Sequence, residues 1–140
     1  MNLKLYDKHK SFGIDANLVA SMIYLVPGLI GMLIPAVSSF TFLIPIIVYF
    51  IERNSKFVRF HCLQYLLLSF VSSLLLYLML FLIVIDESLA VFAITATNLI
   101  TVGMFGALVF CVFKAALWRS WRVPYIGWIA SKIVKEELDQ

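Results

Sequence analysis

The chain has 140 residues, of which 63% are hydrophobic and only 14% are charged, and its mean hydropathy is +1.00. A soluble domain keeps about a quarter of its residues charged, so this composition excludes an ordinary cytosolic enzyme, a disordered tail and a secreted disulfide scaffold. The net charge of +3 lies in short basic clusters between long apolar runs, which argues against nucleic-acid binding. The composition predicts an all-α, polytopic membrane protein that forms one membrane domain over residues 1–140.

Four uncharged stretches are candidates for membrane-spanning helices, because a hydrocarbon core of about 30 Å takes roughly 20 helical residues. The last two, Phe60–Ile85 and Leu89–Phe113, are long enough to cross, whereas the first two, Leu18–Ile34 and Phe40–Ile51, are short. The first pair therefore either crosses a thinned bilayer or forms a re-entrant hairpin. We expect a four-helix bundle in which Asp15 is the N-cap of the first helix.

The third helix is expected to begin before its apolar part, because Asn54 and Ser55 can cap a turn that protrudes from the membrane. Beyond Pro124, apolar side chains recur at helical spacing and polar side chains take the other face. This pattern predicts an amphipathic helix over residues 125–138 that lies on the cytoplasmic leaflet. Aromatic residues that suit an interfacial belt precede it or lie in it: Trp118, Trp121, Tyr125 and Trp128.

Charge predicts the orientation. In a four-span arrangement all 11 Lys and Arg residues fall on the side of the two termini, and only Asp86 and Glu87 lie on the other side. By the positive-inside rule both termini face the cytoplasm. The first residues lack a small-residue cleavage site, so we expect the first apolar run itself to be the membrane-targeting signal.

Small and polar residues at helical spacing in the apolar runs predict contacts between helices. In the first run such residues form one stripe, which could pack against another helix or line a groove, and we favour packing. Asn98 in the fourth run would be costly in lipid unless it bonded a partner helix. The residues predicted to pack helices are Ser21, Gly28, Gly31, Asn98, Gly103 and Gly106.

The third run carries a second polar stripe that is expected to face the bundle interior. His61 could titrate near neutral pH and serve a proton-linked role, but we favour a histidine bonded to a neighbouring helix. Glu52, Lys114 and Pro124 mark the cytoplasmic boundary, where Glu52 could form an ion pair with Lys114 or Arg119. The members of the stripe are His61, Gln64, Tyr65, Ser69, Ser72 and Ser73.

The sequence has no HExxH motif, glycine-rich phosphate loop, nucleophile elbow or cluster with metal-ligand spacing, and no carboxylate in mid-span. We therefore expect no catalysis, no cofactor and no metal. Cys62 and Cys111 are interpreted as small apolar fillers.

Two stretches resemble the family of small bacterial membrane proteins related to the twenty-kilodalton Tic subunit of the chloroplast inner-envelope protein translocon. The segment Asn54-Ser-Lys-Phe-Val-Arg-Phe-His-Cys-Leu-Gln-Tyr-Leu-Leu-Leu68 resembles the family signature SPFVRFHAxQAL, and Lys114-Ala115 with Arg122-Val-Pro-Tyr-Ile-Gly127 resembles the family ending. The resemblance implies four helices, cytoplasmic termini, a bacterial cytoplasmic membrane and, from the plastid member, a link to protein import. The matched positions are Ser55, Phe57, Val58, Arg59, Phe60, His61 and Gln64.

The matched motif can also be explained as architecture. Ser55 would cap the helix, Phe57 and Phe60 would seat its first turns at the interface, and Arg59 would reach an anionic headgroup. His61 and Gln64 would begin the interior polar stripe.

Three functions are open on the sequence alone. The first, which we favour, is a non-catalytic membrane subunit that works through helix contacts, with copies of itself or another membrane protein as partners, in a protein-translocating or envelope complex. The second is an oligomeric channel or carrier lined by the polar stripes of the first and third helices. The third is a recruiter that binds anionic lipid or a cytosolic protein through its basic segments.

Overall fold

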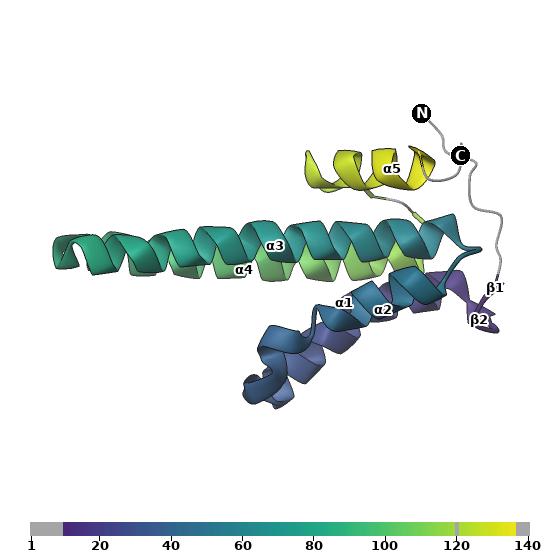
Figure 1. Ribbon diagram of the computed structural model, residues 1–140, viewed down its shortest axis with the longest axis horizontal. Helices are drawn as coiled ribbons and strands as arrows, with labels where there is room; N and C mark the ends of the chain where they lie inside the picture. Colours follow the sequence, from purple (N-terminus) through teal and green to yellow (C-terminus); the bar gives the residue numbers. More distant parts are fainter. Residues whose placement is uncertain (1–9, 120, 137–140) are drawn as a thin grey trace.

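The computed structural model describes residues 10–119 and 121–136, and this part of the chain is almost entirely helical (Figure 1). The all-α expectation is therefore confirmed apart from one very small β-hairpin. In chain order the elements are β1 (Lys10–Ser11), β2 (Ile14–Asp15), α1 (Ala16–Leu33), the 3-10 helix η1 (Pro35–Phe40), α2 (Leu43–Ile51), α3 (Lys56–Ile85), the 3-10 turn η2 (Glu87–Leu89), α4 (Ala90–Ala116) and α5 (Ile126–Glu136).

The β-hairpin ahead of α1 was not expected from the sequence. Lys10 pairs with Asp15 across it, and the two loop residues Phe12 and Gly13 have φ angles of +56° and +77°. Two successive positive φ angles define the tight loop that suits a two-residue hairpin. Asp15 occupies the N-cap position of α1, as predicted, although its side chain makes no capping hydrogen bond.

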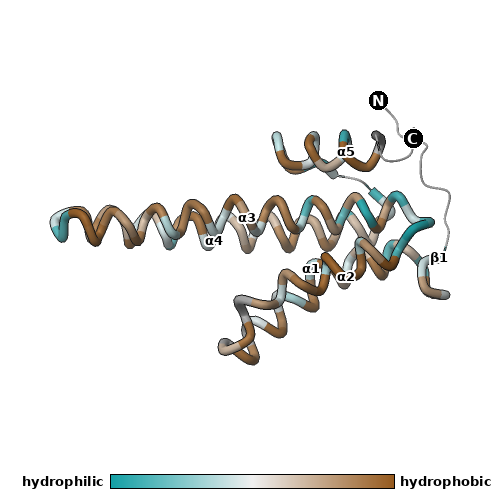
Figure 2. The backbone as a smooth tube through the Cα atoms, in the orientation of Figure 1, coloured by the Kyte–Doolittle hydropathy of each residue, from teal (hydrophilic) through white to brown (hydrophobic). Residues whose placement is uncertain are grey.

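Helices α3 and α4 form a long hairpin, and both are long and apolar enough to cross a membrane. Only 6% and 11% of their most apolar stretches are buried within the protein, unlike the core helices of a soluble domain. Figure 2 shows apolar residues along nearly the whole hairpin. At its tip the Asp86 carboxylate accepts a hydrogen bond from the Ser88 N–H at 2.8 Å, and this bond lowers the pKa of Asp86.

Helices α1 and α2 form a second, shorter hairpin, which diverges from the first and ends far short of its tip (Figure 1). A rise of 1.5 Å per residue gives α1 a length of about 27 Å and α3 a length of about 45 Å. Pro27 lies inside α1 and Pro45 inside α2, and both are buried. The predicted second run begins three residues too early, because residues 40–42 belong to η1 and the turn after it.

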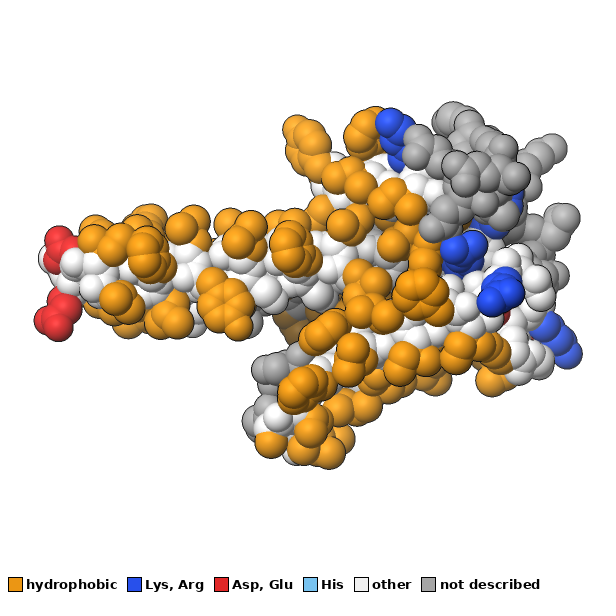
Figure 3. Space-filling view, in the orientation of Figure 1, with side chains coloured by type: hydrophobic (Ala, Val, Ile, Leu, Met, Phe, Trp, Pro, Cys, Tyr) orange, Lys and Arg blue, Asp and Glu red, His pale blue; other side chains and the backbone are white. Residues whose placement is uncertain are grey.

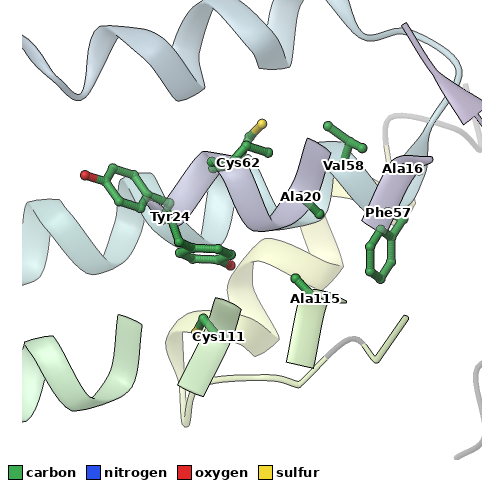
Figure 4. Close-up of a cluster of buried hydrophobic side chains, with 10 residues drawn as sticks. Ala16, Ala20, Tyr24, Phe57, Val58, Cys62, Cys111 and Ala115 are labelled. Atoms are coloured by element: carbon green, nitrogen blue, oxygen red, sulfur yellow. The ribbon is translucent and has the colours of Figure 1, made fainter. Parts of the chain in front are cut away.

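The core lies where the bases of the two hairpins meet. Buried side chains from α1, α3 and α4 form one cluster there, and Figure 4 shows most of its members in close-up. Small residues on α1 and α4 let those helices approach, while Phe57 and Tyr24 fill the larger spaces. The cluster consists of Ala16, Ala20, Ile23, Tyr24, Phe57, Val58, Cys62, Tyr65, Cys111 and Ala115.

Helix α5 is amphipathic, as predicted, and part of its apolar face packs on α3. Its buried residues Ala130 and Val134 pack on Phe60 of α3, with Leu63 and Leu67 beside them. The helix lies alongside the first half of α3 rather than across it (Figure 1). An apolar stripe has the same pattern whether lipid or another helix covers it, so sequence periodicity did not predict the contact with α3. Contact of this helix with the membrane surface stays a prediction. Residues 137 and 138 of the predicted helix lie outside the described residues.

Charged side chains lie at opposite ends of the molecule (Figure 3). On the face that Figure 3 shows, Lys and Arg gather towards the base where the hairpins meet, and apolar side chains cover most of the length between the base and the tip. Asp86 and Glu87 lie at the tip of the α3–α4 hairpin.

Candidate functional site

The buried polar side chains gather at the base of the two hairpins, and this cluster is the candidate site. Six polar residues are almost completely buried, and four of them lie in or next to the segment that resembles the family signature. They are Ser11, Ser21, Glu52, Ser55, His61 and Gln64.

The connection between α2 and α3 is fixed by Glu52 and Ser55. The Ser55 hydroxyl caps α3 by accepting a hydrogen bond from the Val58 N–H at 3.2 Å, as predicted. The Glu52 carboxylate accepts hydrogen bonds from the N–H groups of Asn54 and Ser55, both at 2.9 Å, and from the Ser11 hydroxyl. Glu52 thus stabilises the turn and holds the β-hairpin against it.

The expected ion pair between Glu52 and Lys114 is replaced by other contacts. The Lys114 ammonium lies 4.8 Å from the centroid of the Phe110 ring. The Arg59 guanidinium lies 4.5 Å from the Tyr49 ring on α2. A cation over an aromatic face is stabilised by the ring quadrupole, so both side chains secure the base of the bundle. Contact between Arg59 and a lipid headgroup stays a prediction.

His61 is fully buried and bonds to a neighbouring helix, as the favoured interpretation predicts. Its Nδ1 lies 2.8 Å from the Tyr24 hydroxyl of α1. The rings of Phe57, Phe60 and Tyr24 meet the imidazole edge to face at centroid distances of 4.6, 5.2 and 5.6 Å. Aromatic contacts of this geometry fix the orientation of the imidazole ring.

Gln64 determines the direction of the hydrogen bonds in this cluster. Its Oε1 accepts from the Val123 N–H at 3.4 Å, so its Nε2 is the donor to the Tyr24 hydroxyl at 3.3 Å and to the Cys111 sulfur at 3.4 Å. The Tyr24 oxygen accepts from Gln64, and the Tyr24 hydroxyl also lies within hydrogen-bond distance of His61 Nδ1. His61 Nε2 has no hydrogen-bond partner among the described residues.

Gln64 also fastens the segment that follows α4, and Gly127 makes this approach possible. A Cβ on Gly127 would lie 2.5 Å from the Arg122 Cα and 2.7 Å from Gln64 Oε1. Only glycine fits, since no side chain can tolerate a backbone atom at that distance. Sequence reasoning assigned Gly127 no role of its own, although it lies in the ending that resembles the family's; Pro124 before it is exposed.

Helix α1 is tied to α4 by polar side chains, as the first stripe predicts. The Asn17 amide donates to the Ala116 carbonyl at 2.8 Å. The Ser21 hydroxyl lies 2.8 Å from the Asn17 carbonyl and 3.5 Å from the Val112 carbonyl. The contact between the two helices therefore combines small side chains with hydrogen bonds to carbonyl groups.

Three of the glycines predicted to pack helices make no close contact with the described residues. A Cβ added to Gly28, Gly103 or Gly106 would meet nothing within 4 Å. Gly31 is half-buried, and Asn98 is exposed on α4. Packing of Gly31 and Asn98 against a neighbouring helix stays a prediction.

The outer part of the α3 stripe is not interior. Ser69 and Ser72 are half-buried and Ser73 is exposed. The Ser72 hydroxyl donates to the Ser69 carbonyl of its own helix at 3.0 Å. Only His61, Gln64 and Tyr65 of this stripe are buried. The expectation that the whole stripe faces the interior is therefore wrong for its outer half.

No family model, curated protein or solved structure matches this chain. The resemblance to the Tic-related family therefore stays a prediction. Among the described residues, no three His, Cys, Asp or Glu side chains come close enough together to hold a metal ion. Cys62 and Cys111 are both buried and free, as small apolar fillers would be.

Proposed function

We propose that this protein is a non-catalytic integral membrane subunit that works through lateral helix contacts, as an assembly component of a protein-translocating or envelope complex. The observation that carries the proposal is the contrast between the two ends of the molecule. Polar side chains at the base bond to one another, whereas large apolar side chains on the outer α3–α4 hairpin are exposed. Such a surface needs lipid or partner helices around it.

The arrangement of charge supports a transmembrane orientation for α3 and α4. Basic residues at the base would face the cytoplasm of a bacterial cell, and Asp86 and Glu87 would face the other side of its inner membrane. The short α1–α2 hairpin supports the re-entrant alternative, because it would enter from the cytoplasm and end within the bilayer. The tip of this hairpin, formed by η1 and Thr41, would then be covered by protein or lipid.

Cysteine labelling from outside intact cells tests this topology. Ser88→Cys at the tip of the α3–α4 hairpin should react with a membrane-impermeant maleimide, and Ala36→Cys at the tip of the shorter hairpin should not. Both positions are exposed on the protein, and the native cysteines are buried, so the unmodified chain is the control. Equal labelling of both positions would show a full crossing by the first hairpin, and labelling of neither would contradict the orientation.

The hydrogen bonds at the base favour a subunit over a channel. A conduit lined by the stripes of α1 and α3 would need free polar groups, but Tyr24, His61 and Gln64 bond to each other and to neighbouring groups. The decisive experiment is native mass spectrometry with protein identification on the particle extracted in mild detergent. A companion protein or a defined homo-oligomer supports the proposal, and a chain that is monomeric in detergent and in lipid nanodiscs overturns it.

A further inference from the structure

The exposed side of α4 carries one polar amide among apolar side chains. We call this surface the Asn98 face; its members recur at intervals of four and three residues, the spacing of a straight seam along a helix. Their exposed fractions are high, at 78% for Val91, 71% for Val102 and 69% for Phe105. The Asn98 face consists of Val91, Thr95, Asn98, Val102, Phe105 and Val109.

Asn98 is the member of this face whose hydrogen bonds are missing. Its amide is exposed and has no hydrogen-bond partner among the described residues. The hydroxyls of Thr95 and Thr101 are satisfied inside α4, because they donate to the carbonyls of Val91 and Thr97, both at 2.8 Å. Asn98 lies only about 4.5 Å along the helix from the middle of the uncharged run, so water cannot satisfy it once α4 spans a bilayer.

We propose that the Asn98 face is the contact between two copies of this chain, with the two Asn98 amides hydrogen-bonded to each other across a two-fold axis. The inference rests on the proposed function, since it identifies the partner in a lateral helix contact. An amide carries both donors and an acceptor, so an identical amide at the same depth can donate one hydrogen bond to it and accept one from it. One polar residue in an apolar seam also fixes the register of the two helices.

In a membrane, the Asn98 residues of two copies lie at the same depth. All copies of the chain have the same orientation, because their basic ends face the same side. Two α4 helices related by a two-fold axis along the membrane normal are therefore parallel, and each residue of the seam lies opposite its own copy. The Asn98 face contains no charged residue, so the two copies meet without like-charge repulsion.

Cysteine cross-linking in native membranes tests this geometry without changing Asn98. Oxidation should join Val102→Cys into a disulfide-linked dimer, whereas Tyr77→Cys on α3, which is 71% exposed, should remain monomeric. The unmodified chain is the background control because Cys62 and Cys111 are buried. Cross-linking at position 77 but not at position 102 would overturn the proposal.

Substitution tests the role of the amide itself. Asn98→Leu should lower the association constant of the dimer about tenfold in detergent, and Asn98→Gln should restore most of it because it keeps a donor and an acceptor. Thr101→Val is the matched control: its hydroxyl bonds within its own helix, so the dimer should be unchanged.

The outcomes separate this inference from the proposed function. A wild-type oligomer that is unaffected by Asn98→Leu and not cross-linked at position 102 overturns the Asn98 contact and leaves the subunit proposal standing. So does a complex that contains one copy of this chain beside another protein. A wild-type chain that is monomeric in detergent and nanodiscs overturns both.

Discussion

The substitution Gly127→Ala tests whether the segment after α4 is held by the close approach to Gln64. The added methyl group would lie 2.5 Å from the Arg122 Cα, 2.7 Å from its Cβ and 2.7 Å from Gln64 Oε1. The Arg122 Cα is a backbone atom and the Arg122 Cβ is bonded directly to it, so neither can move away by rotation of the side chain. Overpacking of this kind costs about 1 to 3 kcal/mol, and the gain in helix propensity from glycine to alanine offsets about 0.5 to 1 kcal/mol.

A net loss of about 0.5 to 2 kcal/mol changes the population of the detached segment by a factor of about 2 to 30. Trypsin cleavage after Arg122 and Lys132 measures this population. When the segment detaches and rebinds faster than it is cut, the cleavage rate is proportional to the fraction of molecules in which it is detached. We expect the protein in nanodiscs to be cut faster by about that factor, with α3 and α4 intact.

Gly103→Ala is the matched control for this experiment. It makes the same chemical change in a helix, but the new Cβ meets nothing within 4 Å, so cleavage of the C-terminal segment should stay at the wild-type rate. Equal cleavage of Gly127→Ala and Gly103→Ala would refute this reasoning, because it would show that Arg122 leaves room for a methyl group at position 127.

Three further predictions concern the base and the hairpin tip. Ser55→Ala removes the cap of α3 and should lower the free energy of unfolding by about 1 kcal/mol, measured by denaturant titration in mixed micelles. Tyr24→Phe leaves His61 Nδ1 buried without its partner and should cost about 1 to 3 kcal/mol in the same assay; an unchanged stability would contradict the observed bond. Asp86 has its pKa lowered by the Ser88 N–H, so the 86–89 turn should keep its stability above the ordinary aspartate pKa of about 3.9 and lose it as the pH falls further; faster amide exchange of Ser88 at low pH, absent in Asp86→Ala, would verify this.

The parts of the fold that follow from local chemistry were predictable. The cap by Ser55 depends only on a hydroxyl followed three residues later by a free N–H, and the early start of α3 follows from it. The extent of α3 and α4 follows from two long uncharged runs separated by Asp86 and Glu87. The contact of His61 with a neighbouring helix was also predictable, because a buried imidazole needs a partner.

The parts that depend on which surfaces meet were not predictable from periodicity. Helix α5 has an apolar stripe that fits both lipid and α3, and only the packing of Ala130 and Val134 on Phe60 shows which of its residues meet α3. The requirement for glycine at position 127 arises from the approach of Arg122, which no local pattern encodes.

Side-chain hydrogen bonds between segments far apart in sequence are concentrated at the base of the molecule. Side-chain bonds at the base join segments far apart in sequence: Ser11 with Glu52, Asn17 with Ala116, and Tyr24 with His61.

Beyond Phe70 on α3 and before Val102 on α4, the side-chain hydrogen bonds of the described residues join residues no more than four apart, as from Thr95 to Val91. Apolar contacts without directional bonds between segments hold that part of the hairpin together. The chain therefore has a base joined by directional bonds and a long apolar arm formed by the outer α3–α4 hairpin. Asn98 lies on that arm, which is where one directional bond to a partner would have the largest effect on the arrangement.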